Sequence, residues 1–448
     1  DGFVSPLHKT VLVISKFGNG IQNELWNWKP ALKLHFYRPK KWLSDQYIRV
    51  YSKGMRHLLS SHSFNIVIST TFVGLLAMPV IGPALPVVQT EFYISNRDIG
   101  WILMSSYCLP ALIFVPLFGY LADRYGKKAI LLPTMLLFSL CGGAIGLAEN
   151  TETIIILRLL QGIGASSIAT LNTALVADLF SGRDRVAVMG STGVVQGIGS
   201  GILPLLGGLL ALITWYIPFM TALIGLPVAL YVYLYLENTR PHKVNQKQSY
   251  LAYAWVHLAD RRVIELCFFT FVYIFVGFGA FVSYVPSFLA TAYGTGPLLI
   301  GIIISARALS GSLSAFFLNQ LTLKFSSRTL IVSSFLILGI GMTSIPLVTG
   351  PLGVIFAALC YGAGFGVTRP LVQVYLFELS PDDLRATFSS ANGVALRFAQ
   401  TTSPLIAGFL IGWTSFETMY FIVGIISFLA MSLACFGKSL SSKKTEMG

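Results

Sequence analysis

The ten residues GYLADRYGKK, 119–128, form a short polar break inside a long apolar region. The break carries Asp123 among three basic residues, and the windows on either side of it, 98–121 and 129–148, are mostly apolar. A spanning helix needs about 20 mostly apolar residues, so each window is long enough to cross a bilayer. We therefore predict that the break is a tight turn between two transmembrane helices.

Apolar windows of this length recur along the whole chain. The 448 residues are 54% hydrophobic and only 11% charged, whereas soluble domains are about 25% charged. This composition excludes a soluble enzyme and an intrinsically disordered chain. The predicted transmembrane windows lie near 64–89, 98–121, 129–148, 153–179, 186–212, 215–236, 263–290, 298–322, 329–348, 351–378, 386–412 and 417–436.

The two halves of the chain match each other at an offset of 200 residues. Gly162 meets Gly362, and Pro204 meets Pro404, without a gap between them. We therefore predict an all-α membrane protein with twelve transmembrane helices in two six-helix pseudo-symmetric halves, which is a transporter architecture. The predicted parts are an N-terminal extension (1–63), an N-terminal half (64–236), a linker (237–262), a C-terminal half (263–437) and a tail (438–448).

Basic residues are distributed very unevenly between the predicted loops. With both termini in the cytoplasm, 26 of the 31 Lys and Arg lie on the inner side and Arg97 alone lies on the outer side. The positive-inside rule therefore places both termini in the cytoplasm, and we expect a multi-pass protein of the plasma or inner membrane. The extension mixes Trp and Tyr with ten basic residues. This composition suits the inner lipid headgroup surface, and the alternative is a partly ordered cytoplasmic extension without a separate function.

The ten-residue break resembles the G-x-L-a-D-r-x-G-r-k signature of the major facilitator superfamily, and residues 319–328 are its decayed copy. A second segment, 158–165, is similar to the family's R-x-x-q-G-x-g-a motif, and the chain looks most like the twelve-helix drug:proton antiporters. The resemblance implies a gate in which Asp123 meets the helix that begins near residue 386 when the transporter faces outward. It also implies that Lys127 or Arg124 pairs with Asp178. The predicted gating residues are Gly119, Asp123, Arg124, Gly126, Lys127, Asp178 and Glu378.

Glycines recur at every fourth position along the fifth window. This small-residue stripe predicts close helix packing. The segment resembles the antiporter motif g-x-x-x-G-P-x-x-G-G, but Leu203 replaces the glycine before the proline. The predicted packing residues are Gly193, Gly197, Gly201, Pro204 and Gly208.

Arginines lie near the middle of three windows in the C-terminal half, and no carboxylate lies at that depth in any window. A charge near the bilayer centre costs about 2.5–3.5 kcal/mol, so these arginines predict either a cationic cavity for an anionic substrate or a structural role in capping carbonyls and holding helices. Proton coupling would have to use acids at span ends. The predicted cavity residues are Arg307, Arg369, Arg397, Gln373, Gln400, Arg158, Gln161, Asn172 and Gln196.

The function predicted from these features is secondary active transport by alternating access, with export of a small amphiphilic or anionic organic compound. A flippase of anionic lipids or amphiphiles, and a membrane scaffold or assembly factor that kept the fold without transporting, remain alternatives. No enzyme activity is expected, because the chain has no Ser/His/Asp set, no phosphate-binding loop beside a strand and no paired carboxylates at depth. No metal site is expected, because every histidine lies outside the windows and the five cysteines form no CxxC pair. No cofactor or nucleic-acid partner is expected. The expected partners are the substrate and membrane lipids, and the expected state is a monomer.

Overall fold

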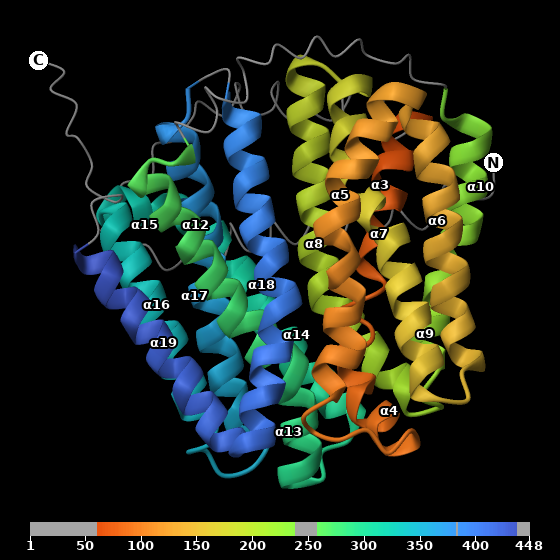
Figure 1. Ribbon diagram of the computed structural model, residues 1–448. Helices are drawn as coiled ribbons and strands as arrows, with labels where there is room; N and C mark the ends of the chain where they lie inside the picture. The colour runs from red at the N-terminus through yellow and green to blue at the C-terminus, as the bar shows by residue number, and fades with distance from the viewer. Residues whose placement is uncertain (1–60, 238–257, 382–383, 437–448) are drawn as a thin grey trace, which may run out of the picture. The chain divides into compact units, whose positions relative to one another are not determined.

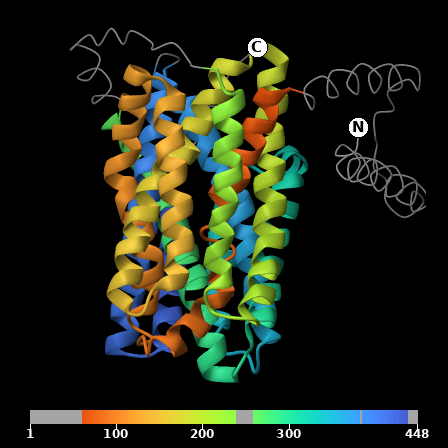
Figure 2. The same cartoon turned by 90° about the vertical axis from the view of Figure 1, so that its right-hand side faces the viewer.

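The structure is a computed structural model that describes residues 61–237, 258–381 and 384–436 (Figure 1). The extension up to residue 60, most of the linker and the tail from residue 437 lie outside the described residues. The described part of the chain is helical and contains no strand. Eleven of its helices are long and apolar enough to cross a membrane, and the long helices lie side by side in both views (Figure 2).

The helices follow the predicted windows closely. The N-terminal half contains α3 (His62–Leu75), α4 (Leu85–Glu91), α5 (Ser106–Tyr125), α6 (Lys127–Ala144), α7 (Thr151–Leu179), α8 (Gly182–Ala211), α9 (Ile217–Met220) and α10 (Gly225–Tyr235). The C-terminal half contains α12 (Arg261–Ile274), α13 (Ser283–Tyr293), α14 (Pro297–Phe316), α15 (Leu318–Lys324), α16 (Ser327–Ser344), α17 (Gly353–Leu379), α18 (Arg385–Trp413) and α19 (Phe416–Phe436). Two π-helical segments, η2 (Trp101–Ser105) and η5 (Phe275–Val282), precede α5 and α13.

The first window is not the continuous helix that the sequence predicts. Turn residues 76–81 and the short helix η1 (Gly82–Ala84) separate α3 from α4, which lie toward opposite ends of the bundle (Figure 1). Pro79, Pro83 and Pro86 fall in this region, and each removes a backbone donor and clashes with the preceding turn. The eighth window, 298–322, is also divided, because α14 ends at Phe316 and α15 begins at Leu318.

The sequence repeat has a counterpart in the contacts between helices. A Cβ built on Gly162 would lie 2.2 Å from the carbonyl oxygen of Tyr107, and one built on Gly362 would lie 2.1 Å from that of Arg307. Gly362 is 200 residues after Gly162, and its partner Arg307 is 200 residues after Tyr107. Each half therefore brings its second and fourth helices together at the same place, and only glycine fits there.

Contacts between the halves concentrate at one end of the bundle, which we call the Arg97 end. There, Gly408 of α18 lies against the backbone of Arg97. A Cβ built on Gly408 would stand 2.2 Å from the carbonyl oxygen of Arg97. At the opposite end, which we call the Asp123 end, a Cβ built on Gly119, Gly190 or Gly393 would have nothing within 4 Å. These glycines belong to α5, α8 and α18, the helices that contact the other half. We interpret the open space beside them as a separation of the two halves at the Asp123 end.

Candidate functional site: cavity and gate

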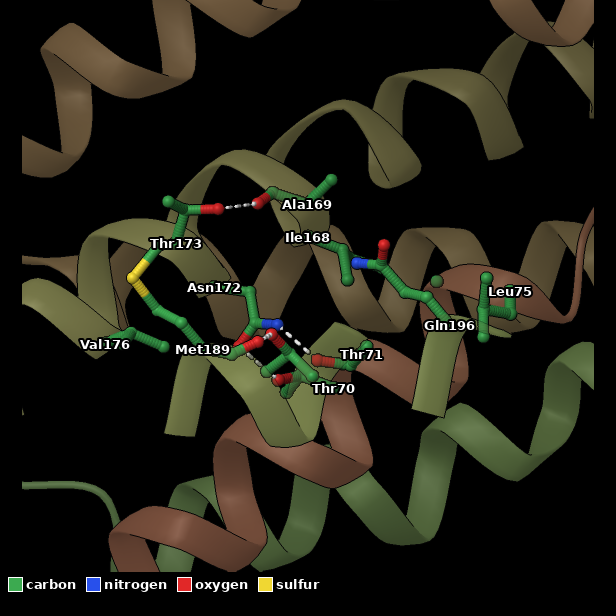
Figure 3. A pocket seen from close by; sticks show the side chains of 12 residues that line it. Thr70, Thr71, Leu75, Ile168, Ala169, Asn172, Thr173, Val176, Met189 and Gln196 are labelled. Carbon is green, nitrogen blue, oxygen red and sulfur yellow. Dashed lines mark hydrogen bonds between the residues drawn. The ribbon is translucent and has the colours of Figure 1, made fainter. Parts of the chain in front are cut away.

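A cavity of about 240 Å³ lies between α3, α7 and α8 (Figure 3). Asn172 of α7 is held in its wall, because its Oδ1 accepts from Thr70 Oγ1 (2.9 Å) and its Nδ2 donates to Thr71 Oγ1 (2.6 Å). Gln196 of α8 also lines the cavity. Two of the predicted cavity residues therefore share one pocket, whose wall offers hydroxyl, amide and apolar atoms and no charged group.

The C-terminal half contains a related polar network. Thr270 Oγ1 donates to Asn392 Oδ1 (2.6 Å), and Asn392 Nδ2 donates to Gln373 Oε1 (3.1 Å). Gln373, a predicted cavity residue, also donates to Ser389 Oγ at 3.4 Å, so its amide ties α17 to α18. Sequence reasoning missed Asn392, and the repeat does not mark it, because the residue 200 positions earlier is Thr192.

Arg158 and Gln161 lie inside the N-terminal half and do not line the pocket beside Asn172. Both are 0% exposed. Arg158 Nη1 donates to Gln161 Oε1 (2.9 Å) and to Ala77 O (3.4 Å). The guanidinium stands 5.3 Å from the ring centre of Tyr107 and 5.2 Å from that of Phe219, so two aromatic faces stabilise its charge.

The other three predicted arginines lie in the C-terminal half, where no described acidic residue pairs with them. Arg307 and Arg369 stand over aromatic rings of α17, 5.5 Å from Tyr361 and 6.0 Å from Phe365. Arg397 Nη1 donates to Oε1 of Gln400, another predicted cavity residue, at 3.1 Å. Among the described residues, no carboxylate forms an ion pair with any of the three, so their positive charge is not neutralised within this part of the chain.

The motif between α5 and α6 forms a turn next to an ion pair. Gly126 has φ +94°, a conformation that side chains disfavour. Lys127 Nζ pairs with the carboxylate of Asp178 at the end of α7 and donates to Ala174 O (3.1 Å). Arg124 stands over the ring of Tyr125 instead. Lys127 is therefore the basic residue of the motif that contacts Asp178.

The remaining gating residues face open space in this arrangement. Asp123 and Glu378 are exposed, and neither forms an ion pair with another described residue. A Cβ built on Gly119 would have nothing within 4 Å. The state of the structure is thus the one in which the Asp123 carboxylate does not contact the other half.

The glycine stripe of α8 faces α14 and diverges from it toward the Asp123 end. A Cβ built on Gly208 would lie 2.5 Å from Pro297 O, on Gly201 3.7 Å from Leu309, and on Gly197 3.6 Å from Ser312. A Cβ built on Gly193 would have nothing within 4 Å. The predicted packing residue Pro204 of α8 is also in close contact with α14, because a Cβ built on Gly301 would stand 2.5 Å from its carbonyl oxygen. The predicted packing residues therefore make a tight contact at one end and leave a gap at the other.

Comparisons with known proteins agree with this geometry. The model of the Major Facilitator Superfamily matches residues 67–401 and 288–446. Multidrug resistance protein 1 of Bacillus subtilis is 24% identical over 353 residues, which are 78% of this chain and 89% of that protein. The Bacillibactin exporter of the same organism is 33% identical over 159 residues, or 34% and 39% of the two chains.

A solved structure shows the same fold. The nucleoside transporter NupG superposes with a TM-score of 0.69 at 13% sequence identity, covering 83% of this chain and 99% of that one. The family match spans most of the described helices. The chain belongs to the major facilitator superfamily, and it is a multi-pass membrane transporter and not an enzyme.

Proposed function

We propose that this transporter exports a small amphiphilic organic anion from the cytoplasm by alternating access. Export is supported by the relatives, which are named as a multidrug resistance protein and an exporter. Cytoplasmic termini, in a plasma or inner membrane, are supported by the 26 basic residues on one side against Arg97 on the other. In this orientation the Asp123 end faces the cytoplasm, and the described state is open toward the compartment that holds the substrate.

The anionic character of the substrate rests on one observation, the uncompensated arginines of the C-terminal half. Arg307, Arg369 and Arg397 lack an acidic partner among the described residues, and the Nε of Arg307 is buried without any hydrogen-bond partner there. Each such charge costs about 2.5–3.5 kcal/mol within a bilayer. A carboxylate, sulfate or phosphate on the substrate would offset that cost.

The uncharged part of the substrate is assigned to the N-terminal half. The pocket beside Asn172 has a volume of about 240 Å³ and no charged lining. Ligand sites of this kind combine apolar walls with a few fixed polar groups. Asn172, held by Thr70 and Thr71, is such a group, so we infer that it contacts the neutral portion of the substrate together with Gln196, which also lines the pocket.

The gate is proposed to work through the motif between α5 and α6. The Lys127–Asp178 pair ties that turn to the end of α7, which leaves the Asp123 carboxylate as the free group of the turn. We infer that Asp123 contacts the start of α18 when the halves close at this end, and that the gap beside Gly193 closes in the same movement. Glu378 occupies the place of Asp178 in the other half and completes this set.

Single substitutions to Gln at Arg307, Arg369 and Arg397 test the substrate class. Export from membrane vesicles is measured for carboxyfluorescein, an aromatic anion, and for Nile red, a neutral amphiphile. A lost charge-assisted hydrogen bond is worth about 1.5–3 kcal/mol, so anion export should fall at least about tenfold while neutral export stays within about twofold.

The matched control is Arg261→Gln, because Arg261 has 83% of its side chain exposed at the start of α12. That variant should export both compounds at the parent rate. Equal losses of both compounds in the three cavity variants would return the arginines to a structural role. Movement of a labelled anionic phospholipid, and of neither dye, would identify a flippase instead.

A further inference from the structure

The two interfaces between the halves are built differently at the Arg97 end, although the repeat makes them equivalent. In the α8–α14 interface, Gly208 lies against Pro297 O and Gly301 lies against Pro204 O, each with 2.5 Å from a built Cβ to the oxygen. These are contacts between bare backbones. Among the described residues, no side-chain hydrogen bond joins α8 to α14 at this end.

In the α5–α18 interface, the equivalent carbonyl groups are those of Arg97 and Pro404, each 200 residues from its counterpart. A side chain contacts both of them. The single hydroxyl proton of Tyr284 is shared in a bifurcated hydrogen bond between Pro404 O at 2.8 Å and Arg97 O at 3.1 Å. Tyr284 belongs to α13, and it is 0% exposed. Its hydroxyl therefore connects the C-terminal half to the segment just before η2 in the N-terminal half.

Small residues make room for this tyrosine on both sides. A Cβ built on Gly100 would lie 2.4 Å from Tyr284 Oη, and one built on Gly408 would lie 2.3 Å from it. The residue 200 positions earlier is Ala84, which has no hydroxyl. Within the described helices, the α8–α14 interface therefore has no counterpart of this connection, which is built from an aromatic ring that fits between two glycines of opposite halves.

We propose that Tyr284 is the gate residue that holds the Arg97 end closed, and that opening toward the outside requires its hydrogen bond to Arg97 O to break. Tyr284 moves with the C-terminal half and Arg97 with the N-terminal half, so any separation of the halves at this end lengthens that bond. The proposal rests on the alternating-access part of the proposed function and is independent of the direction of transport and of the substrate.

The test uses Tyr284→Phe, which removes the hydroxyl and keeps the ring. The reporter is Ser105→Cys, placed in η2, which packs against α18. Ser105 is 4% exposed and its Oγ has no partner among the described residues, so the exchange removes no hydrogen bond. Labelling by a polar methanethiosulfonate is followed by mass spectrometry on substrate-free protein in lipid nanodiscs, and labelling of the same chain without the reporter is subtracted.

The matched control is Tyr293→Phe. Tyr293 also lies in α13, and its hydroxyl also donates to a backbone carbonyl, that of Val348 at 2.8 Å, but both residues belong to the C-terminal half. A buried hydrogen bond changes an equilibrium by about fivefold. Labelling at position 105 should therefore become about fivefold faster in Tyr284→Phe and stay at the parent rate in Tyr293→Phe.

A second variant guards against misfolding. Gly408→Ala introduces a methyl group 2.2 Å from Arg97 O and 2.3 Å from Tyr284 Oη, so it should force the same interface apart and accelerate labelling in the same direction. Unchanged labelling in folded Tyr284→Phe, or an equal increase in Tyr293→Phe, would overturn the proposal. Because no substrate is present, a failed export assay leaves this result unaffected, and a failed labelling result leaves the export proposal unaffected.

Discussion

Replacing Gly162 or Gly362 by alanine should destabilise the protein by similar amounts, although the two glycines lie in different halves. Each glycine lies where its helix crosses a neighbour. The new methyl group would stand 2.2 Å from Tyr107 O in the first case and 2.1 Å from Arg307 O in the second. Both neighbours are backbone atoms, so no rotation of a side chain can relieve the contact.

The size of the effect follows from two opposing contributions. An ordinary contact distance is about 3.5 Å or more, so α7 and α5 must separate by about 1 Å, and overpacking of this kind costs about 1–3 kcal/mol. Alanine recovers up to about 1 kcal/mol of helix propensity over glycine. With the full gain in helix propensity, the net loss against the parent is about 0–2 kcal/mol, and the loss against an alanine variant that makes no clash is about 1–3 kcal/mol.

The control is Gly190→Ala in α8, where a built Cβ has nothing within 4 Å. That variant keeps the gain in helix propensity and makes no clash, so it should unfold at the parent temperature or slightly above it. Thermal unfolding of the three variants in detergent is followed by tryptophan fluorescence at one scan rate, because membrane proteins often unfold irreversibly. Gly162→Ala and Gly362→Ala variants that unfold at or above the temperature of Gly190→Ala would refute the close crossings.

Two further predictions concern charged groups near the helix ends. Asp123→Asn should weaken closure at the Asp123 end. The reporter is Gly193→Cys, whose thiol lies beside the gap along α8. In the outward-facing state this thiol should react faster in the Asp123→Asn variant than in the parent. Equal reaction rates in the two proteins would remove the switching role of Asp123. Asp260 caps α12, and its pKa is lowered because the Arg262 side chain and then the Arg262 N–H donate to its carboxylate. Because the pKa of Asp260 is lower in the folded protein than in the unfolded chain, the ionised carboxylate stabilises the cap at pH values above the unfolded-state pKa, and this stabilisation is lost as the pH falls through the folded-state pKa. Protection of the Arg262 amide against hydrogen exchange should therefore fall at acidic pH. In Asp260→Asn this pH dependence should disappear.

The membrane-spanning architecture can be predicted from sequence, because a bilayer imposes a simple requirement on any segment that crosses it. Backbone groups in the hydrocarbon must be bonded within their own helix, so long apolar windows become helices almost regardless of their neighbours. The windows 153–179 and 417–436 correspond to α7 (Thr151–Leu179) and α19 (Phe416–Phe436) within a few residues. The repeat and the motif at 119–128 were equally readable, because glycine, proline and charge mark positions where few other residues fit.

The break in the first window needed the structure, even though its prolines were visible in the sequence. Proline is tolerated in membrane helices where neighbours satisfy the freed backbone groups. Pro110, Pro116 and Pro133 do lie inside continuous helices. Three prolines within eight residues of the first window end α3 at Leu75 instead. Composition alone does not separate these two outcomes.

The role of each polar side chain was decided by tertiary structure. Arg158 and Asn172 share a helix and were both predicted for the cavity, yet Arg158 packs between aromatic rings while Asn172 lines a pocket. Tyr284 reads from sequence as one more aromatic residue of an apolar window. Its contacts with Arg97 O and Pro404 O exist only because helices far apart in the chain meet there. Sequence determined which segments enter the membrane, and the packing of those segments determined which side chains line a pocket and which contact the other half.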